Sequence, residues 1–333
     1  MAEITVSTVI METADACSLV FKESFPYRPG QFLTLRVPSD STGSVARCYS
    51  LCTSPDVDDH PAVTVKRTPG GYASNWICDN AKPGTTFEAL APAGIFTPGS
   101  VDVDLLLLAA GSGITPIMSI IKSALARGSG ALTLIYANRD DRSVIFHDQL
   151  RALADRHPTR LTVIHWLESV QGLPTTAHLR ALTSPFARTE ALICGPKPFV
   201  TAARTALADL KVPKSRIHIE RFVSLSGNPF EHATVDEPAS GDRQSTVEVE
   251  LDGARHRLSW PAHTKLLDLF LDNGLAAPYS CRAGACSACA CRLVSGEVKM
   301  LNNEVLEQED LDDGIILACQ SLPVTDLVEI SYE

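Results

Sequence analysis

The cysteines give the first indication of chemistry in this chain. Three of the ten follow the spacing Cys281-x4-Cys286-x2-Cys289, and Cys319 stands further along. A [2Fe-2S] cluster takes four thiolates, two for each iron, and three ligands this close in sequence require a loop that wraps the cluster. The loop CRAGACSACAC is rich in Gly, Ala and Ser, which let backbone N–H groups approach the sulfurs. The spacing therefore predicts a [2Fe-2S] cluster held by Cys281, Cys286, Cys289 and Cys319.

Two other interpretations of these cysteines are a zinc site and a set of plain buried thiols. Structural zinc sites usually combine two CxxC units, or one such unit with histidines, and neither pattern is present. Cys291 lies two residues after Cys289, and we expect it to be a packed neighbour, because Cys319 is better separated in sequence to close the cage. Cys17, Cys52 and Cys78 are expected to pack in the core.

The tetrapeptide Arg47-Cys48-Tyr49-Ser50 combines the groups that a flavin needs. An aromatic plane can stack on the ring system, a cation can bind the phosphate, and a hydroxyl can bond to the ring edge. Residues two apart in a strand point the same way, so Arg47 and Tyr49 share a face. An ordinary exposed strand could carry the same residues, and the tetrapeptide gains weight from the motifs that follow it.

A second flavin element follows downstream. Lys66 precedes a Gly-containing turn, and the segment NWICDNA after it is expected to begin a helix. The N-terminus of a helix offers free N–H groups and a positive dipole end, which suit a diphosphate. The predicted contacts are Lys66, Gly71, Tyr72, Ala73 and Ser74.

The segment LLLLAAGSGITPIMSII indicates a buried strand, a Gly-x-Gly turn and a helix. Gly111 and Gly113 permit a tight turn and a close approach to a pyrophosphate, and Pro suits the first turn of a helix. Pro116 stands where a dinucleotide fingerprint would have its third glycine, and an ordinary strand-to-helix turn remains the alternative. The residues predicted to bind the nucleotide here are Gly111, Ser112, Gly113, Thr115 and Pro116.

Two further segments complete the predicted nucleotide site. Cys194-Gly195-Pro196 follows the strand EALICG and precedes a helix, which suits a nicotinamide at the carboxyl edge of a parallel sheet. Asp140 follows the strand ALTLIYAN, where a carboxylate can bind ribose hydroxyls and repel a 2′-phosphate. The positive charges of Arg139 and Arg142 would instead attract a 2′-phosphate. We nevertheless expect NADH to be favoured over NADPH.

The elements around these motifs indicate a multidomain α+β protein. Residues 1–100 have short β-branched strands typical of an antiparallel β-barrel, and residues 101–225 alternate strands and helices, as in a parallel α/β domain. Residues 226–245 are polar and rich in Gly, Pro and Ser, so we expect a linker. Residues 246–333 begin with a hairpin around Asp252-Gly253, followed by a helix that ends at Gly274.

Composition and charge limit the partners. The net charge of −10 argues against nucleic acid. From residue 246 to 333 there are 15 Asp and Glu against 6 Lys and Arg, a local net charge of −9. The chain starts without the basic and apolar pattern of a secretory signal, and its longest apolar run is too short for a membrane helix. We therefore expect a cytoplasmic protein without membrane contacts.

The order of the motifs resembles the ferredoxin–NADP reductase superfamily with a plant-type ferredoxin module at the C-terminus, a β-grasp fold. The segments PGQFLTLRV and APAGIF also resemble that superfamily. Within it, RCYSLCTSP, VKRTPGGYASNW and YANRDDRSVIF are very similar to the reductase components of 3-ketosteroid 9α-hydroxylases, which are two-component Rieske oxygenases of steroid degradation.

The resemblance implies a role for each matching residue. Arg47 would bind the flavin phosphate, Tyr49 would stack on the isoalloxazine and Ser50 would bond to its edge. A diphosphate at Gly71–Ser74 implies FAD, and Cys194 would lie beside the nicotinamide. Glu220 and Phe222 resemble the segment that covers the other flavin face, although Phe222 could instead be an aromatic residue packed between domains.

The resemblance implies transfer of electrons from NADH through FAD and a [2Fe-2S] cluster to a Rieske-type oxygenase. One alternative is the reductase of a different oxygenase or hydroxylase, and another is direct reduction of a small acceptor such as a quinone. A passive electron carrier would not need the nucleotide motifs, and a small acceptor would not need the attached cluster.

Overall fold

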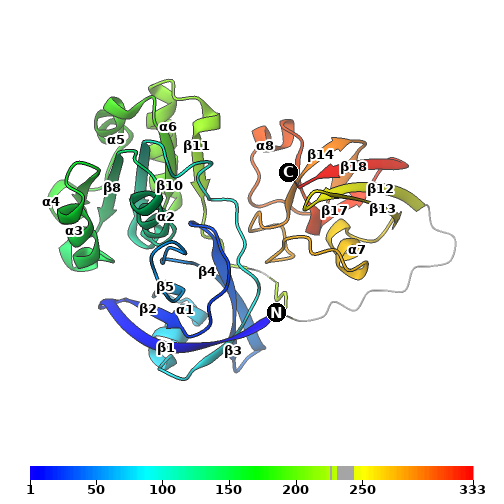
Figure 1. Ribbon diagram of the computed structural model, residues 1–333, viewed down its shortest axis with the longest axis horizontal. Coiled ribbons are helices and arrows are strands. Elements are labelled where there is room, and N and C mark those ends of the chain that lie inside the picture. Colours follow the sequence, from blue (N-terminus) through cyan, green and yellow to red (C-terminus); the bar gives the residue numbers. More distant parts are fainter. Residues whose placement is uncertain (226, 231–243, 333) are drawn as a thin grey trace. The chain divides into compact units, whose positions relative to one another are not determined.

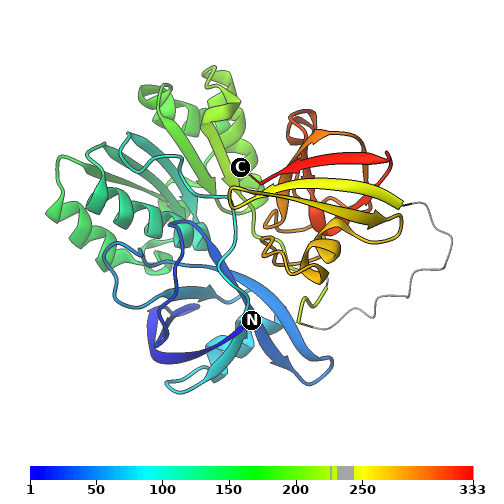
Figure 2. The same cartoon turned by 45° about the vertical axis from the view of Figure 1, so that its right-hand side comes forward.

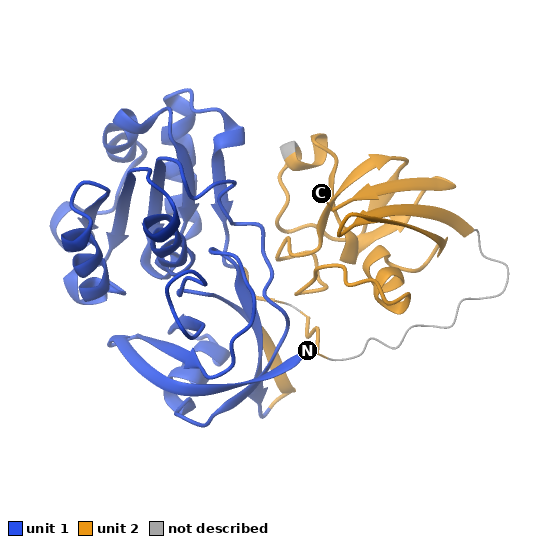
Figure 3. Cartoon of the chain, viewed as in Figure 1, with its two compact units in different colours: residues 1–40, 47–222 blue, residues 41–46, 223–333 orange. Residues whose placement is uncertain are grey.

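The computed structural model describes residues 1–225, 227–230 and 244–332, and they divide into two compact units. The first unit comprises Met1–Asp40 and Arg47–Phe222, and the second comprises Ser41–Ala46 and Val223–Glu333 (Figure 3). Apart from residues 41–46 and 223–225, the first two predicted modules thus belong to one unit, and the cysteine-rich module belongs to the other. Of the linker predicted over residues 226–245, residues 226 and 231–243 lie outside the described residues.

The N-terminal part is an antiparallel sheet of six strands in the order β4-β3-β6-β1-β2-β5, as the strand pattern predicts. An isolated bridge between Leu51, directly after β4, and Val63 of β5 joins the two outer strands of this order, so the sheet curls into a barrel. The elements are β1 (Ala2–Thr13), β2 (Ala16–Phe21), β3 (Phe32–Ser39), β4 (Gly43–Ser50), β5 (Ala62–Lys66), α1 (Tyr72–Asn80) and β6 (Thr86–Ala89) (Figure 1).

The next part is a parallel five-stranded sheet in the order β11-β10-β7-β8-β9. Its strands are β7 (Leu105–Ala110), β8 (Leu132–Asn138), β9 (Leu161–Leu167), β10 (Glu190–Cys194) and β11 (Ile217–Glu220). Its helices are α2 (Ile114–Arg127), α3 (His147–Arg156), α4 (Glu168–Gln171), α5 (Thr176–Thr183) and α6 (Lys197–Asp209).

Alternate residues of β7 enter two different cores. Leu105 and Leu107 pack with residues of α2 and α3, whereas Leu106 and Leu108 pack with residues of α5 and α6 (Figure 1). A strand that is buried on both faces needs a continuous apolar run, which explains the segment LLLLAA.

The barrel and the parallel sheet are joined by α2. Ser119 donates a hydrogen bond to the backbone oxygen of Thr53 at 2.5 Å, and the hydroxyls of Ser54 and Ser123 lie 2.7 Å apart. Lys122 forms an ion pair with Asp58 at 3.1 Å. One apolar core also includes residues of both parts, so they form a single unit rather than two loosely linked domains.

Two strand-to-helix turns of the parallel sheet pack directly against each other. A β-carbon at Gly113, in the turn after β7, would overlap the carbonyl oxygen of Cys194 at the end of β10. A β-carbon at Gly195 would lie 2.9 Å from that of Ala110. Only glycine permits such close backbone approach, so this contact fixes the two turns relative to each other.

The second unit has a mixed sheet in the order β13-β12-β18-β14-β16 and a small sheet of β15 and β17, which is the predicted β-grasp arrangement. Helix α7 packs its apolar residues on the core around Trp260 (Figure 2). The elements are β12 (Gln244–Leu251), β13 (Ala254–Pro261), α7 (Leu266–Asp272), β14 (Ala290–Ser295), β15 (Val298–Met300), α8 (Gln308–Asp312), β16 (Ile315–Leu317), β17 (Ser321–Pro323) and β18 (Leu327–Ser331).

The predicted hairpin and helix of this unit are confirmed. Asp252 and Gly253, with φ of 52° and 72°, form the two-residue turn between β12 and β13, and Gly274 follows α7 with φ of 75°. Gln244 and Ser245, the last two residues of the expected linker, pair with Pro261 and Trp260 of β13. Among the described residues, no helix is both long and apolar enough to cross a membrane.

The packing of the two turns predicts a large effect from one methyl group. Gly113→Ala should lower the free energy of unfolding by about 2 kcal/mol or more, because the new β-carbon forces the turns apart. Gly99→Ala should stay within about 0.5 kcal/mol, because Gly99 is exposed and no atom lies within 4 Å of the position that a β-carbon would take there. Urea unfolding followed by circular dichroism measures both, and equal losses would contradict this explanation.

Candidate functional site

The four predicted cluster ligands converge as two pairs. The sulfur of Cys286 accepts a hydrogen bond from the backbone N–H of Cys281 at 3.3 Å. The sulfur of Cys289 accepts one from the backbone N–H of Cys319 at 3.4 Å. The side chains of Cys281 and Cys319 also contact each other. Two contacting pairs match the two thiolates per iron that a [2Fe-2S] cluster requires.

The loop around these sulfurs supplies backbone donors. The N–H groups of Ala283 and Ala285 both point at the sulfur of Cys281, at 3.3 Å. Arg282 and Ser287 have φ of 54° and 51°, which turns the chain sharply around the thiols. Such N–H groups stabilise thiolate charge, so the loop fits an anionic sulfur centre.

Two neighbours of the cluster loop have distinct roles. Cys291 is buried, and its sulfur faces the carbonyl oxygen of Ile316, so it is the packed neighbour that the sequence predicts. Gln320 donates from its side chain to the oxygens of Arg282 and Cys319, and its nitrogen lies 3.6 Å from the sulfur of Cys319. Sequence reasoning missed Gln320, and its position directly after Cys319 is the signal that could have identified it.

The zinc alternative gains no support. Within the described residues, no group of three or more His, Cys, Asp or Glu is arranged to hold a single metal ion. The side chain of Cys281 contacts those of Cys286 and Cys319, and Cys319 also contacts Cys289, so the four predicted ligands form one continuous group. This arrangement favours a two-iron cluster.

In the barrel, Arg47 and Tyr49 lie near each other on β4, as their spacing predicts. The positive charge of Arg47 acts on the Tyr49 hydroxyl, while burial, the larger effect, raises the pKa of that hydroxyl. Ser50 is buried at the end of the same strand. Tyr49 therefore remains an uncharged aromatic surface at neutral pH.

Helix α1 begins at the predicted flavin diphosphate segment. Gly71 occupies the N-cap position, no side chain caps the helix, and its first turn has no acidic residue. Ser74 accepts a hydrogen bond from the backbone N–H of Thr68 at 3.0 Å, which fixes the loop before the helix. Tyr72 is largely exposed and Ala73 is buried. The residues at this helix start fit an anion.

Lys66 lies against the nucleotide turn. A β-carbon at Gly111 would lie 3.8 Å from the Lys66 ammonium, and Gly111 has φ of 53°. Asp15 lies 3.9 Å from the same ammonium and pairs with Arg139 at 2.9 Å. Desolvation lowers the pKa of Lys66. The lysine predicted from the flavin motif is thus placed to reach a phosphate at the glycine turn, and sequence reasoning missed Asp15.

The residues of the nucleotide turn divide into exposed and buried groups. Gly111 and Ser112 are partly exposed, whereas Gly113, Thr115 and Pro116 are buried. The Thr115 hydroxyl donates to the backbone oxygen of Ser112 at 3.0 Å. Thr115 and Pro116 therefore support the turn from behind, and its first two residues are the accessible ones.

Cys194 and Glu220 are direct neighbours on the paired ends of β10 and β11. Burial raises the pKa of the Cys194 thiol well above its ordinary value. Desolvation raises the pKa of Glu220 to about 8. Both groups are therefore mainly protonated at neutral pH. Gly195 and Pro196 continue the turn, and Phe222 lies half exposed two residues after β11.

Asp140 has a structural partner. Its carboxylate accepts a hydrogen bond from the backbone N–H of Ser143 at 2.9 Å, and its own N–H donates to the Ser143 hydroxyl at 3.1 Å. This capping box holds the carboxylate just after the end of β8. The charge is thus fixed at the place where the sequence predicts contact with a ribose.

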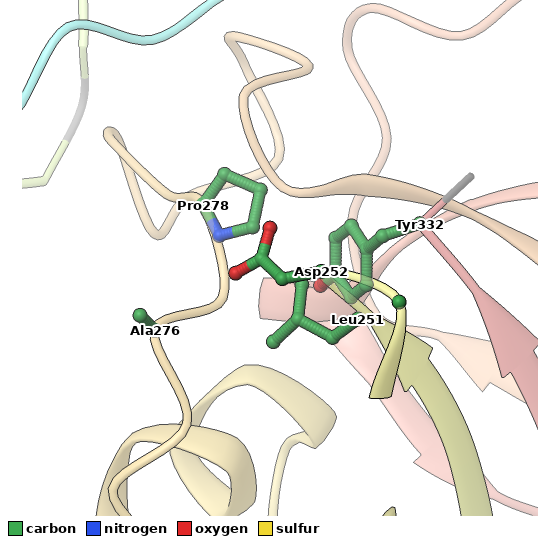
Figure 4. A pocket seen from close by; sticks show the side chains of 6 residues that line it. Leu251, Asp252, Ala276, Pro278 and Tyr332 are labelled. Atoms are coloured by element: carbon green, nitrogen blue, oxygen red, sulfur yellow. The ribbon is translucent and has the colours of Figure 1, made fainter. Parts of the chain in front are cut away.

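A cavity in the second unit is lined by Leu251, Asp252, Gly253, Ala276, Pro278 and Tyr332 (Figure 4). Its volume is about 380 Å³, and Figure 4 shows Asp252 and Tyr332 at its side. None of these residues is a predicted cofactor ligand. The cavity therefore does not belong to the candidate redox site.

The comparisons with known families confirm the three predicted cofactor types. Residues 6–97 match the Oxidoreductase FAD-binding domain, residues 107–205 match the Oxidoreductase NAD-binding domain, and residues 249–324 match the 2Fe-2S iron-sulfur cluster binding domain. The chain is also similar to the solved structure of phthalate dioxygenase reductase, with a TM-score of 0.58 and 23% identity over 99% of this chain and 97% of that one. At this identity, the likeness supports the fold alone.

Relatives of known function extend over nearly the whole chain. The 3-ketosteroid-9-alpha-monooxygenase ferredoxin reductase component of Mycobacterium tuberculosis is 58% identical, over 99% of this chain and 96% of the relative. The protein of the same name from Rhodococcus rhodochrous is 55% identical over the same shares. With such identity over nearly the full length, the chain belongs to the family of 3-ketosteroid-9-alpha-monooxygenase ferredoxin reductase components.

Proposed function

We propose that this chain takes a hydride from NADH onto FAD and passes the electrons singly through a [2Fe-2S] cluster to an oxygenase that hydroxylates a 3-ketosteroid. The observation that carries the proposal is the full-length similarity to reductase components that bear this name. The three cofactor domains supply the consecutive steps of such a path. We propose the domain bounds 1–100, 101–225 and 246–333 for them.

The barrel residues orient the flavin. Arg47 binds its phosphate, Tyr49 stacks on its ring, and Ser50 bonds to the ring edge. The start of α1, from Gly71 to Ser74, holds the diphosphate through backbone N–H groups. Bound FAD supplies the chemistry that accepts a hydride and releases single electrons. The protein contributes alignment, because stacking and hydrogen bonds fix the reacting atoms in place.

The parallel sheet positions the nicotinamide nucleotide. The turn Gly111-Ser112-Gly113 binds its diphosphate with help from Lys66, while Thr115 and Pro116 support that turn. Cys194, Gly195 and Pro196 border the nicotinamide. Desolvation raises the pKa of Glu220 beside Cys194 to about 8, so this edge is mainly uncharged at neutral pH. Phe222 covers the flavin face opposite to Tyr49.

The cluster module passes electrons on. Cys281 and Cys286 bind one iron, and Cys289 and Cys319 bind the other. Glu304 is exposed, and its backbone N–H bonds to the oxygen of Gly284 in the cluster loop, so acidic surface lies at the rim of this loop. A partner with a basic patch would be attracted to that rim. We propose that the partner is the Rieske-type oxygenase component.

A cytoplasmic location is part of the proposal. None of the ten cysteines, all of which lie among the described residues, is paired in a disulfide, which suits a reducing compartment. Direct reduction of a quinone or ferric complex is a weaker proposal, because flavin alone could serve such an acceptor. Steady-state turnover with the oxygenase, cytochrome c and ferricyanide side by side tests the choice of acceptor.

The cluster assignment predicts different effects for two neighbouring thiols. Cys319→Ser should abolish or strongly weaken the cluster, because one iron loses a thiolate. Cys291→Ser should retain it, because this thiol packs against Ile316. Iron and acid-labile sulfide analysis of the purified variants gives the result. A complete cluster in the Cys319 variant would remove that residue from the ligand set.

The nucleotide assignment predicts a preference for NADH in kcat/KM. Asp140→Asn should keep the cap on Ser143 but remove the negative charge, so NADPH should gain relative to NADH by about fivefold. The fully exposed Asp148, in α3, provides a matched control, and Asp148→Asn should leave the ratio unchanged. If the wild-type protein used NADPH as well as NADH, the assignment would be wrong.

The docking proposal predicts that electron transfer to the oxygenase slows as salt rises. The Debye length falls from about 10 Å at 0.1 M to about 3 Å at 1 M, which screens exposed charges. Glu304→Gln should lower the second-order rate in stopped-flow measurements at low salt, whereas Asp148→Asn should not. Reduction of the flavin by NADH is the internal control. A rate that stays flat with NaCl would refute electrostatic docking.

A further inference from the structure

Two cysteines of the barrel that take no part in the proposed electron path lie in contact. Cys17 is on β2, Cys78 is on α1, and their sulfurs are 3.6 Å apart, with the Cys17 thiol donating to Cys78. Val65 of β5 is the direct strand partner of Cys17, and its carbonyl oxygen lies 3.7 Å from the Cys78 sulfur. Helix α1 therefore packs over β2 and β5 at this pair.

The two thiols differ in exposure and in charge. Cys17 is 1% exposed, whereas Cys78 is partly exposed. The hydrogen bond from Cys17 lowers the pKa of Cys78, and the positive charge of Arg67 acts in the same direction. The same contact and burial raise the pKa of Cys17. Cys78 is thus the accessible and more acidic thiol, and Cys17 is a buried thiol within reach of it.

We propose that Cys17 and Cys78 form a peroxide-responsive thiol pair, in which Cys78 is oxidised first and Cys17 resolves it to a disulfide. The Cys78 thiolate attacks hydrogen peroxide, the O–O bond breaks, and a sulfenic acid and hydroxide form. The Cys17 sulfur then attacks the sulfenic sulfur, an S–S bond forms, and the oxygen leaves as water. In total, two thiols and one peroxide give one disulfide and two waters.

The neighbouring cysteines provide a contrast. The sulfur of Cys52 is buried and faces the oxygen of Ala62 at 3.3 Å, and that of Cys48 lies 3.4 Å from the Thr34 hydroxyl. Formation of a disulfide needs two sulfurs that can approach to bonding distance without large backbone movement. The contact between Cys17 and Cys78 meets this need.

The disulfide would tie α1 to β2 across a long loop of the barrel. Such a cross-link restricts the unfolded chain and raises thermal stability. Helix α1 begins at the segment proposed to hold the FAD diphosphate, so the disulfide should also make the protein retain FAD to a higher temperature. This expectation rests on the proposed function. The chemistry of the thiol pair does not depend on it.

The first test identifies the linked cysteines. The holoprotein is treated with hydrogen peroxide, free thiols are blocked with N-ethylmaleimide, and peptides from a non-reducing tryptic digest are analysed by mass spectrometry. Cys17 and Cys78 fall in different tryptic peptides with one cysteine each, so their link is unambiguous even if peroxide also damages the cluster. The expected product is a Cys17–Cys78 linked peptide that dithiothreitol separates. If N-ethylmaleimide labels both Cys17 and Cys78 after peroxide treatment, the proposal is overturned.

Variants test the order of the steps. In Cys17→Ser, Cys78 should remain as a sulfenic acid that dimedone labels, whereas in Cys78→Ser dimedone should not label Cys17. Cys48→Ser is the matched control and should form the disulfide as the wild type does. Equal labelling of Cys17 and Cys78 would overturn the assigned order.

The temperature at which FAD is released, measured by FAD fluorescence, tests whether the disulfide stabilises the contact between α1 and β2. Peroxide should raise the release temperature of the wild type by about 5 °C relative to Cys17→Ser treated in the same way. If the disulfide forms but the release temperature of FAD does not change, the disulfide does not stabilise the contact between α1 and β2. Whether the disulfide itself forms is decided by the peptide analysis. The two failures are therefore distinguishable.

Discussion

The contact between two backbone turns at the carboxyl edge of the parallel sheet is the constraint on which the nucleotide site depends. Gly113 meets the Cys194 carbonyl with no room for a side chain, and Gly195 meets Ala110 in the same way. This contact sets the spacing between the start of α2 and the end of β10. The turn from Gly111 to Gly113 and the Cys194–Glu220 pair are thereby held in one fixed relation, which the proposed hydride transfer needs.

In both units, the protein itself sets the charge at the predicted site, by backbone N–H groups in one unit and by burial in the other. At the cluster loop, backbone N–H groups of Ala283 and Ala285 surround sulfurs that must carry negative charge. At the sheet edge, burial keeps Cys194 and Glu220 mainly protonated, so that negative charge is avoided. Backbone dipoles and desolvation thus set the charge at each site before any cofactor or partner binds.

Much of the fold and of the candidate site could be predicted, because the spacing of cysteines and glycines depends directly on the loops and turns that the backbone must form. The ligand loop, the Asp252-Gly253 hairpin and the Gly111 turn are of this kind. Short strands such as β6 and β11 have no clear local pattern, because pairing with other strands stabilises them. Contacts between distant residues also left no local signal, including Asp15 with Arg139 and Cys17 with Cys78.

The central claim is that electrons pass from the nicotinamide to the flavin and only then to the cluster. Rapid anaerobic mixing of the holoprotein with NADH tests it most directly, with flavin absorbance and the electron paramagnetic resonance of the cluster followed in the same samples. The account predicts that the flavin absorbance falls first and the signal of the reduced cluster rises afterwards. A cluster signal that appears before the flavin changes would contradict it.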